Sequence, residues 1–293
     1  MKPDYLKIKL RPPNKNRKHI EMLLKKYNLR TICDYALCPN KCECYNNSEL
    51  TFLILGPYCS RKCGFCRIST IDSSPDLDYS EPYNILKIAK ILKLKYVVIT
   101  STTRDDLPFY GASHFAEITT LLKNNNIPVE LLIPDFNGDN KCYEIIYNSK
   151  PDVISHNIET VPALYNKFRQ DFSFDRSISL LKWFREKDKD VILKTSILVG
   201  IGETINDLTK VFTILYNYQI NILIIGQYLQ PTKNNPLVVK YYSLDEFKLL
   251  ENLALRCGIP VVVSSPFARS SYKASSIKSK VVIESACGES VQI

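Results

Sequence analysis

The sequence predicts an α/β protein built on a sheet of parallel strands joined by helices. From residue 51 onward, short apolar runs rich in β-branched residues alternate with amphipathic helical patterns, as in repeated βαβ units. Polar and glycine-containing segments follow these runs repeatedly, and barrels of this type carry their functional loops there. The chain has 293 residues, enough for one such barrel with extensions.

We expect six strands, and a seventh segment at residues 259–263 that closes or edges the sheet. The six lie at residues 51–56, 96–100, 129–133, 153–158, 191–199 and 222–226. Residues 1–50 lack the alternation, so we interpret them as an N-terminal extension laid against the barrel. The barrel is assigned to residues 51–265, and a Ser-rich C-terminal tail to residues 266–293.

Two of the helices between these strands show a stripe of apolar residues at helical spacing. The stripes consist of Ile85, Ile88, Ala89 and Leu92, and of Ile205, Leu208, Phe212 and Leu215. Pro82 stands in the first turn of the earlier helix, where its missing N–H costs nothing. Thr204 and Asp207 resemble a capping pair for the later helix. Both stripes are expected to face the core.

The composition is that of a soluble globular protein, with 45% hydrophobic and 24% charged residues. The N-terminal residues form no apolar stretch of signal-peptide type, and no run approaches the roughly 18 apolar residues of a membrane helix. We therefore expect a cytoplasmic protein with no membrane partner. Ten cysteines in such a chain indicate metal binding or catalysis, because a reducing compartment keeps thiols free.

Seven of the ten cysteines fall in one short segment. They are Cys33, Cys38, Cys42, Cys44, Cys59, Cys63 and Cys66. The remaining three, Cys142, Cys257 and Cys287, lie apart and are interpreted as ordinary small apolar residues.

The later triad, Cys59-Ser-Arg-Lys-Cys63-Gly-Phe-Cys66, directly follows the first predicted strand. Three thiolates can hold a 4Fe-4S cluster while one iron stays without a protein ligand. The amino and carboxylate groups of S-adenosylmethionine (SAM) can chelate that open iron, so that an electron from the cluster breaks the C–S bond and yields a 5′-deoxyadenosyl radical. A zinc site is the alternative. Zinc prefers four ligands, and the three histidines of the chain all lie away from this loop.

The earlier triad, Cys33-x4-Cys38-x5-Cys44, predicts a second cluster. A four-sulfur site that includes Cys42 is conceivable. However, Cys42 and Cys44 are so close in sequence that both ligating one cube would be cramped, and we expect Cys42 to be a bystander.

Candidate SAM-binding residues follow several of the predicted strands. They are Ser101, Asn157, Glu159, Gly200, Gly202, Glu203 and Gln227. Asn157 and Glu159 offer hydrogen bonds to ribose hydroxyls or to the methionyl ammonium, and Gly200 and Gly202 would let backbone approach a nucleoside closely. For either glycine alone, a plain turn is an equally good interpretation.

Motifs spread over nearly the whole chain resemble those of lipoyl synthases. They are Lys2-Pro-Asp-Tyr-Leu-Lys7, Cys38-Pro-Asn40, Thr100-Ser101, Arg104-Asp-Asp-Leu107, His156-Asn-Ile-Glu159, Val199-Gly-Ile-Gly-Glu-Thr204, Gly226-Gln-Tyr-Leu-Gln-Pro-Thr232 and Arg269-Ser-Ser-Tyr272. The spacing of the earlier triad and the Arg-Ser-Ser-Tyr motif are the most specific, because other radical enzymes do not share that pair. Two loops depart from the family pattern. Phe109-Tyr-Gly-Ala112 stands where the family tends to show Asp-Gly-Gly-Ala, and Asn47-Ser-Glu-Leu50 replaces the small residues usual before Thr51.

The resemblance implies a partial (β/α)6-type radical SAM barrel with an N-terminal cluster-binding extension and a C-terminal tail. It implies that Cys33, Cys38 and Cys44 hold an auxiliary 4Fe-4S cluster whose fourth ligand is Ser271, and that this cluster is sacrificed as a sulfur source. Phe65, by position, resembles the aromatic residue that radical enzymes place near the adenine.

The activity implied is the insertion of two sulfur atoms, at C6 and C8 of an octanoyl chain carried by a lysine of a lipoyl carrier domain, with two SAM molecules consumed. An electron donor such as flavodoxin or ferredoxin is implied as a second partner. Residues 1–30 carry a net charge of +8, which suits an acidic carrier surface or nucleic acid, or is simply a solvated basic tail.

Other classes of function fit less well. Biotin synthase also inserts sulfur, but its sacrificial cluster is ligated from within the barrel. A tRNA methylthiolating enzyme would need a larger cluster domain and an RNA-binding domain, for which no residues remain, so nucleic acid is not an expected partner. A non-catalytic iron-sulfur carrier or zinc module would gain from four firm thiolates per site, whereas here two sites have three each.

Overall fold

The computed structural model describes residues 3–7, 12–70 and 76–288, with side chains described to residue 281 in the last helix. Its centre is a sheet of seven parallel strands in the order β1 to β7, with β1 and β7 at the two edges. The strands are β1 (Thr51–Ile54), β2 (Val97–Ser101), β3 (Val129–Leu132), β4 (Val153–Ser155), β5 (Ile192–Val199), β6 (Ile222–Gln227) and β7 (Val261–Ser265). The predicted fold class is confirmed, and the seventh segment is a strand that edges the sheet beside β6.

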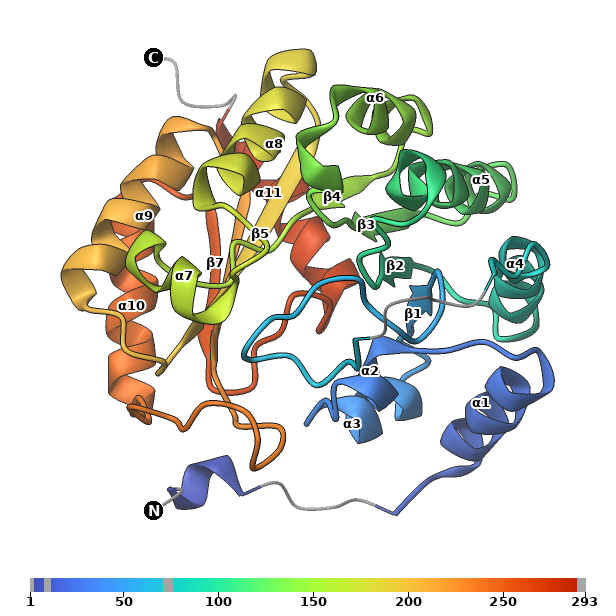
Figure 1. Cartoon of the computed structure of the whole chain (residues 1–293), viewed down its shortest axis with the longest axis horizontal. Helices are drawn as coiled ribbons and strands as arrows, with labels where there is room; N and C mark the ends of the chain where they lie inside the picture. Colours follow the sequence, from blue (N-terminus) through green and yellow to red (C-terminus); the bar gives the residue numbers. More distant parts are fainter. Residues whose placement is uncertain (1–2, 8–11, 71–75, 289–293) are drawn as a thin grey trace.

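Helices follow the strands and surround the sheet on its outer side (Figure 1). They are α4 (Glu81–Ile91), α5 (Ala112–Lys123), α6 (Asn140–Asn148), α7 (Tyr165–Phe168), α8 (Phe174–Lys187), α9 (Ile205–Asn217) and α10 (Leu244–Arg256). The predicted cap of α9 is confirmed, because Thr204 and Asp207 form a reciprocal capping box. The predicted core stripe is wrong for Ile205, which is 43% exposed at the first position of α9.

The two faces of β6 pack against different partners because side chains alternate along a strand. Leu223 and Ile225 belong to the main core under the outer helices. Ile222 and Ile224 face the other way and pack against Ile277 and other residues of the C-terminal tail. The tail contains α11 (Ala274–Gly288), which lies near the centre of the ring of strands (Figure 1). We had not expected this helix from the Ser-rich sequence.

The N-terminal extension contains α1 (Lys15–Lys26), α2 (Ile32–Tyr35) and α3 (Lys41–Asn46). A bridge between Thr31 and Phe52 joins it to β1 in antiparallel orientation. The buried Tyr45 hydroxyl lies 2.5 Å from the Thr31 hydroxyl and 2.7 Å from Asp34 Oδ2, so α3 is tied to the segment that enters α2. Figure 1 shows these short helices beside the β1 edge.

Candidate functional site

The loop after β1 carries Cys59, Cys63 and Cys66, all half-buried. The backbone of this loop is fixed from outside. Gly64 N donates to Phe168 O at 2.8 Å, and the Asn235 amide donates to the carbonyls of Gly64 and Cys66 at 2.9 Å each. The segments around α7 and after β6 therefore hold the part of the loop between the second and third cysteines.

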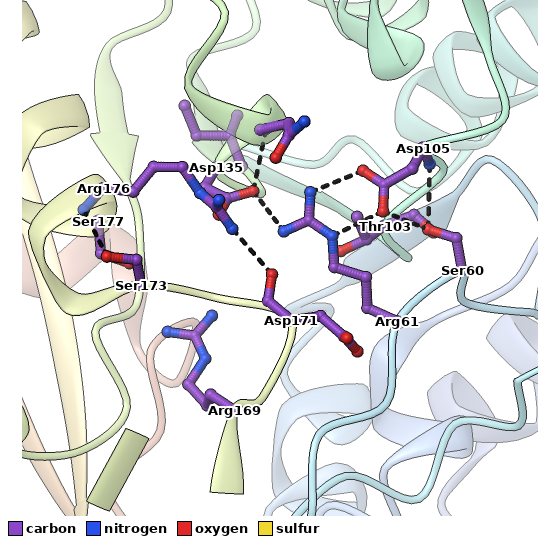
Figure 2. Close-up of polar contacts among 12 residues, drawn as sticks. Ser60, Arg61, Thr103, Asp105, Asp135, Arg169, Asp171, Ser173, Arg176 and Ser177 are labelled. Carbon is purple, nitrogen blue, oxygen red and sulfur yellow. Dashed lines mark hydrogen bonds and ion pairs between the residues drawn. The ribbon is translucent and has the colours of Figure 1, made fainter. Parts of the chain in front are cut away.

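Arg61, between the first two cysteines, clamps the other half of the loop (Figure 2). Its Nε and Nη2 donate to the two oxygens of Asp105 at 2.6 Å each, and its Nη1 donates to Asp135 Oδ1 at 2.7 Å. Arg176 Nε donates to the other oxygen of Asp135 at 2.5 Å. Asp135 is fully buried and Arg61 is 5% exposed, so the ion pair between these two is shielded from water. Loops after β2 and β3 thus meet the cysteine loop through charges that neutralise one another.

Neighbouring backbone groups complete this clamp. Ser60 N donates to Thr103 O at 2.8 Å, and Lys62 N donates to Asp171 Oδ2 at 2.9 Å. The Phe172 ring contacts both the Arg61 guanidinium, 4.5 Å from its centroid, and the Arg169 guanidinium, 4.1 Å away. Each residue from 60 to 62 is therefore held by a contact to another loop.

Burial disfavours the thiolate forms of Cys63 and Cys66. Burial raises the pKa of Cys63 to about 12 and that of Cys66 to about 11, and the nearby Cys59 and Glu159 add to both increases. The Arg169 charge works in the opposite direction on the pKa of Cys63. Three thiols in one water-poor loop favour a metal that replaces their protons, because thiolates are the ligands of iron-sulfur clusters.

Phe65 packs in a small apolar cluster with Phe168, Ile201 and Tyr228. These residues belong to the loops after β1, β5 and β6 and to α7, so the cluster brings distant loops together over the carboxyl ends of the strands. A flat aromatic side chain beside the cysteine loop is a suitable neighbour for an adenine ring.

Asn157 and Glu159 lie together after β4. Asn157 Nδ2 donates to Glu159 Oε1 at 2.9 Å, and its Oδ1 accepts a hydrogen bond from Ser270 of the tail at 2.8 Å. Burial raises the pKa of Glu159, while the charges of Arg169 and Arg269 oppose that increase. Glu159 thus stands between the cysteine loop and the C-terminal tail.

The glycine loop after β5 is closed by its own glutamate. Glu203 accepts hydrogen bonds from the backbone N–H of Gly200 at 2.6 Å, of Ile201 at 3.0 Å and of Gly202 at 3.1 Å. At Gly200, which has φ +99°, a Cβ would lie 2.2 Å from Gln227 Nε2. Glycine is required there by the packing of the protein itself.

Gln227 is fully buried, and its amide is engaged with backbone. Its Nε2 donates to Val199, Tyr228 and Lys240 carbonyls, and its Oε1 accepts from Tyr242 N. Ser101 differs: its hydroxyl is buried at the end of β2 without a hydrogen-bond partner among the described residues. Of these two predicted SAM contacts, Ser101 is the one with hydrogen-bonding capacity left.

The earlier cysteine triad lines a cavity of about 420 Å³ at the β1 side of the sheet. Cys33 comes from α2, Cys44 from α3 and Cys38 from the turn between them. Ser271 and Arg269 of the C-terminal tail line the same cavity. The structure therefore brings Ser271 to the three cysteines that precede it by more than two hundred residues.

Specific contacts fix the tail at this position. Asn40 Nδ2 donates to Phe267 O at 2.7 Å, and the Tyr272 hydroxyl donates to Glu43 Oε1 at 2.8 Å. The tail also passes directly over β6, where a Cβ on Gly226 would lie 2.2 Å from Ala268 O. Only glycine allows this approach.

The pKa values of the three thiols in the earlier triad are shifted in different directions. The hydrogen bond from Cys33 lowers the pKa of Cys38 to about 6, helped by the backbone N–H of Asn40 and the charge of Arg269. The same hydrogen bond, together with burial, raises the pKa of Cys33, and burial raises that of Cys44. One thiolate is thus favoured before any metal arrives.

The donor set in this cavity fits an iron-sulfur cluster: three sulfurs, a serine oxygen and room between them. No three Cys, His, Asp or Glu side chains within the described residues lie close enough to bind a single metal ion, whereas cluster ligands bind separate irons. Glu49 Oε2, beside the triad, is buried without a hydrogen-bond partner in the part of the chain that is described. Cys42 contacts Arg17 and does not line the cavity.

Several residues of the site were missed by sequence reasoning. They are Arg61, Asp105, Asp135, Arg169, Arg176, Asn235 and Arg269. The position of Arg61 between two cysteines and of Arg269 in the Arg-Ser-Ser-Tyr motif were signals in the sequence. Nothing local distinguishes Asp135 or Asn235. In the described ranges, no helix is long and apolar enough to cross a membrane.

The chain matches the sequence profile of the radical SAM superfamily over residues 53–215, more than half its length. Solved structures agree on the fold. Methylornithine synthase has a TM-score of 0.54 at 16% identity, covering 80% of this chain and 81% of that one. SuiB of Streptococcus suis bound to its precursor peptide has a TM-score of 0.57 at 17% identity, covering 85% and 52%. The protein is a radical SAM protein by fold and by sequence.

Curated relatives show which family within this superfamily the chain belongs to. A lipoyl synthase of Aquifex aeolicus is 46% identical over 257 residues, covering 87% of this chain and 93% of that protein. A lipoyl synthase of Alkaliphilus metalliredigens is 43% identical over 276 residues, covering 93% and 94%. The chain belongs to the lipoyl synthase family, which confirms the resemblance seen in its motifs.

Proposed function

We propose that this protein is a lipoyl synthase that inserts two sulfur atoms, at C6 and C8, into a protein-bound octanoyl group. The observation that carries the proposal is the presence of two separate cysteine triads, one on the loop after β1 and one that shares a cavity with Ser271. A single radical reaction needs one cluster. A second, differently ligated site gives the enzyme a place for the sulfur that it transfers.

In this proposal, Cys59, Cys63 and Cys66 hold one 4Fe-4S cluster, and Cys33, Cys38, Cys44 and Ser271 hold the other. When bound, the first cluster supplies the electron that cleaves SAM into methionine and a radical able to remove hydrogen from the octanoyl chain, and the second supplies sulfur.

The protein's own residues position SAM. Phe65 offers a surface for the adenine, the free hydroxyl capacity of Ser101 offers a hydrogen bond, and Asn157 and Glu159 offer polar groups next to the cysteine loop. The contacts of Gly200, Gly202, Glu203 and Gln227 support an indirect role for these four, in which they hold the rim of the site in shape.

Ser271 gives the second site an exchangeable ligand. An alkoxide oxygen is a harder donor than a thiolate, so the iron that it holds is the easiest one to release when sulfur is withdrawn. The octanoyl chain would be delivered by a lipoyl carrier domain and electrons by a donor such as flavodoxin or ferredoxin, in the cytoplasm.

The test is anaerobic reconstitution of the full chain, followed by iron and sulfide analysis and an assay with an octanoylated carrier peptide. We expect about eight irons per chain, the sum of two four-iron clusters. We also expect 5′-deoxyadenosine and a peptide heavier by two sulfur atoms as the dithiol, which loses two hydrogens when it is afterwards oxidised to the disulfide. About four irons, zinc in place of iron, or 5′-deoxyadenosine without any sulfur-containing peptide would overturn the proposal.

A further inference from the structure

We infer that Glu49 is an iron-binding residue of the auxiliary site, a fifth protein donor beside Cys33, Cys38, Cys44 and Ser271. This inference rests on the proposed function, because it assumes that an iron-sulfur cluster occupies the cavity.

The backbone places Glu49 against the triad. It lies in the turn between α3 and β1, where Ser48 has φ +60°, and its N–H donates to Cys44 O at 2.9 Å. Asn16 of α1 holds the same turn by donating to Ser48 Oγ at 2.9 Å and to the Tyr45 carbonyl at 3.1 Å. The turn is therefore fixed on both sides, and the carboxylate is kept next to the cavity.

Glu49 is the single carboxylate among the described residues that line the cavity. Its Oε2 is buried and has no hydrogen-bond partner among those residues. A buried carboxylate oxygen without a partner is costly, so such an atom usually marks a place where another group binds. A cation that reaches the cavity would satisfy this oxygen.

The Glu49 side chain also lies close enough to Cys44 for its charge to act on that thiol. An iron bound by Cys44 would therefore have the Glu49 carboxylate as a neighbour, and a carboxylate is a good ligand for ferrous iron.

The role that follows is retention of iron while the auxiliary cluster is dismantled. Ser271 would give up the iron and take a proton from water, leaving hydroxide, while the Glu49 carboxylate would hold the iron in its place. The iron keeps its oxidation state, so no further reductant or oxidant is needed. Glu49 would slow the loss of iron from the site after sulfur has left.

The test is iron release from the anaerobically reconstituted full chain to a coloured ferrous chelator. To isolate the auxiliary site, the comparison is made in a chain whose Cys59, Cys63 and Cys66 are replaced by alanine. We expect Glu49→Gln to release iron on the order of tenfold faster, the effect typical of losing a supporting group at a metal site. Glu117→Gln on α5 is the matched control, since Glu117 is an exposed acid that does not line the cavity.

Equal release from the wild-type background and Glu49→Gln, or equal acceleration by Glu117→Gln, would overturn the inference. If Glu49→Gln does not fold, Glu49→Asp and Glu49→Ala replace it: the retained carboxylate should release iron more slowly than alanine, and equal rates count against Glu49. A background chain that takes up no iron would instead refute the proposed second cluster.

Discussion

The two cysteine triads are assembled in opposite ways. Cys59, Cys63 and Cys66 lie on one loop, and that loop is clamped by charged and polar groups from its neighbours. The auxiliary site combines two short helices with a serine from the far end of the chain. The first is a local motif that the barrel holds rigidly, whereas the second exists only when extension, barrel and tail are all in place. Their independence can be tested by breaking each one separately.

The largest effect should come from Cys63→Ala. Removing one of three thiolates on the loop leaves too few ligands for the radical cluster, so SAM cleavage should fall to background. The auxiliary site should still load about four irons per chain, because it shares no ligand with the loop. Product analysis for 5′-deoxyadenosine and metal analysis measure the two sites. Release of 5′-deoxyadenosine by this variant would show that the loop assignment is wrong.

Ser271→Ala should have the opposite effect, with the auxiliary site impaired and SAM cleavage retained. We expect lipoyl formation to fall by at least about 100-fold, roughly 2.7 kcal/mol in barrier, while SAM cleavage continues. Ser271→Cys should load its cluster well yet release sulfur slowly, because a thiolate holds iron more firmly. Ser276→Ala is the control, since Ser276 lies in the same tail, bonds to the Lys273 carbonyl and does not line the cavity. Normal lipoyl formation by Ser271→Ala would point to another fourth ligand.

Arg61→Ala should weaken the local triad through its support. The change leaves Asp105 without its bidentate partner and Asp135 with Arg176 alone, and breaking a buried pair costs about 3 kcal/mol of unfolding free energy. Iron at the loop should be lost faster to a chelator, with auxiliary iron unchanged. Arg61→Lys should recover part of both properties. Chemical denaturation and chelator kinetics measure them, and an unaffected loop would show that the backbone contacts suffice.

His156 gives the same region a dependence on pH. It is buried between Ile133 O, 2.9 Å away, and Ser177 Oγ, 3.0 Å away, and burial lowers its pKa to about 4 from the usual 6.5. The unfolded chain therefore takes up a proton before the folded one does. Stability is complete above pH 6.5 and should fall by about 2 kcal/mol on going to pH 5.

The measurement is chemical denaturation of the metal-free chain at pH 7.5 and pH 5, with His156→Gln as the comparison. The glutamine variant should lose less stability between the two values. An equal loss in both proteins would assign the pH dependence to other groups.

The smallest effect concerns the basic arm. Lys15, Lys18 and Lys25 of α1 are part of the +8 charge of residues 1–30. If the arm attracts an acidic carrier domain, salt should slow association a few-fold more in the wild type than in a variant with these lysines changed to glutamine. Neutralising Lys90, Lys182 and Lys210 on the outer helices is the control. Equal salt sensitivity would leave the arm a solvated tail.

The sheet was predictable because each buried parallel strand is a short apolar run, and its position follows from local sequence. The predicted strand at residues 153–158 was too long, since β4 ends at Ser155 and Glu159 rejoins β5 through a bridge with φ +62°. The sequence did not predict the helix α11, because its buried apolar residues are only Ala274, Ile277 and Val281 among serines and lysines. Its packing partners lie on β6 and β7, far away in sequence.

The candidate site also has parts that local sequence predicts and parts that only the fold brings together. Cysteine spacing suggested both triads as candidate ligand sets, because residues on one loop or short helix are close in space when they are close in sequence. The partners of Arg61 could not be predicted in this way. Asp105 and Asp135 come from separate βα units and contact Arg61 only in the folded barrel. Gln227 was predicted as a SAM contact from its position after a strand, and sequence could not reveal that its amide is occupied by backbone groups.

The passage of the tail over Gly226 has a consequence for the order in which the protein matures. Residues 268–271 can settle only on a finished β6, and they are made after all seven strands. During synthesis the loop after β1 has its three cysteines from an early stage, whereas the cavity of the earlier triad gains Ser271 only when the tail has left the ribosome. With Ser271 as the proposed fourth ligand, the auxiliary cluster would be completed late, on a barrel that has already folded.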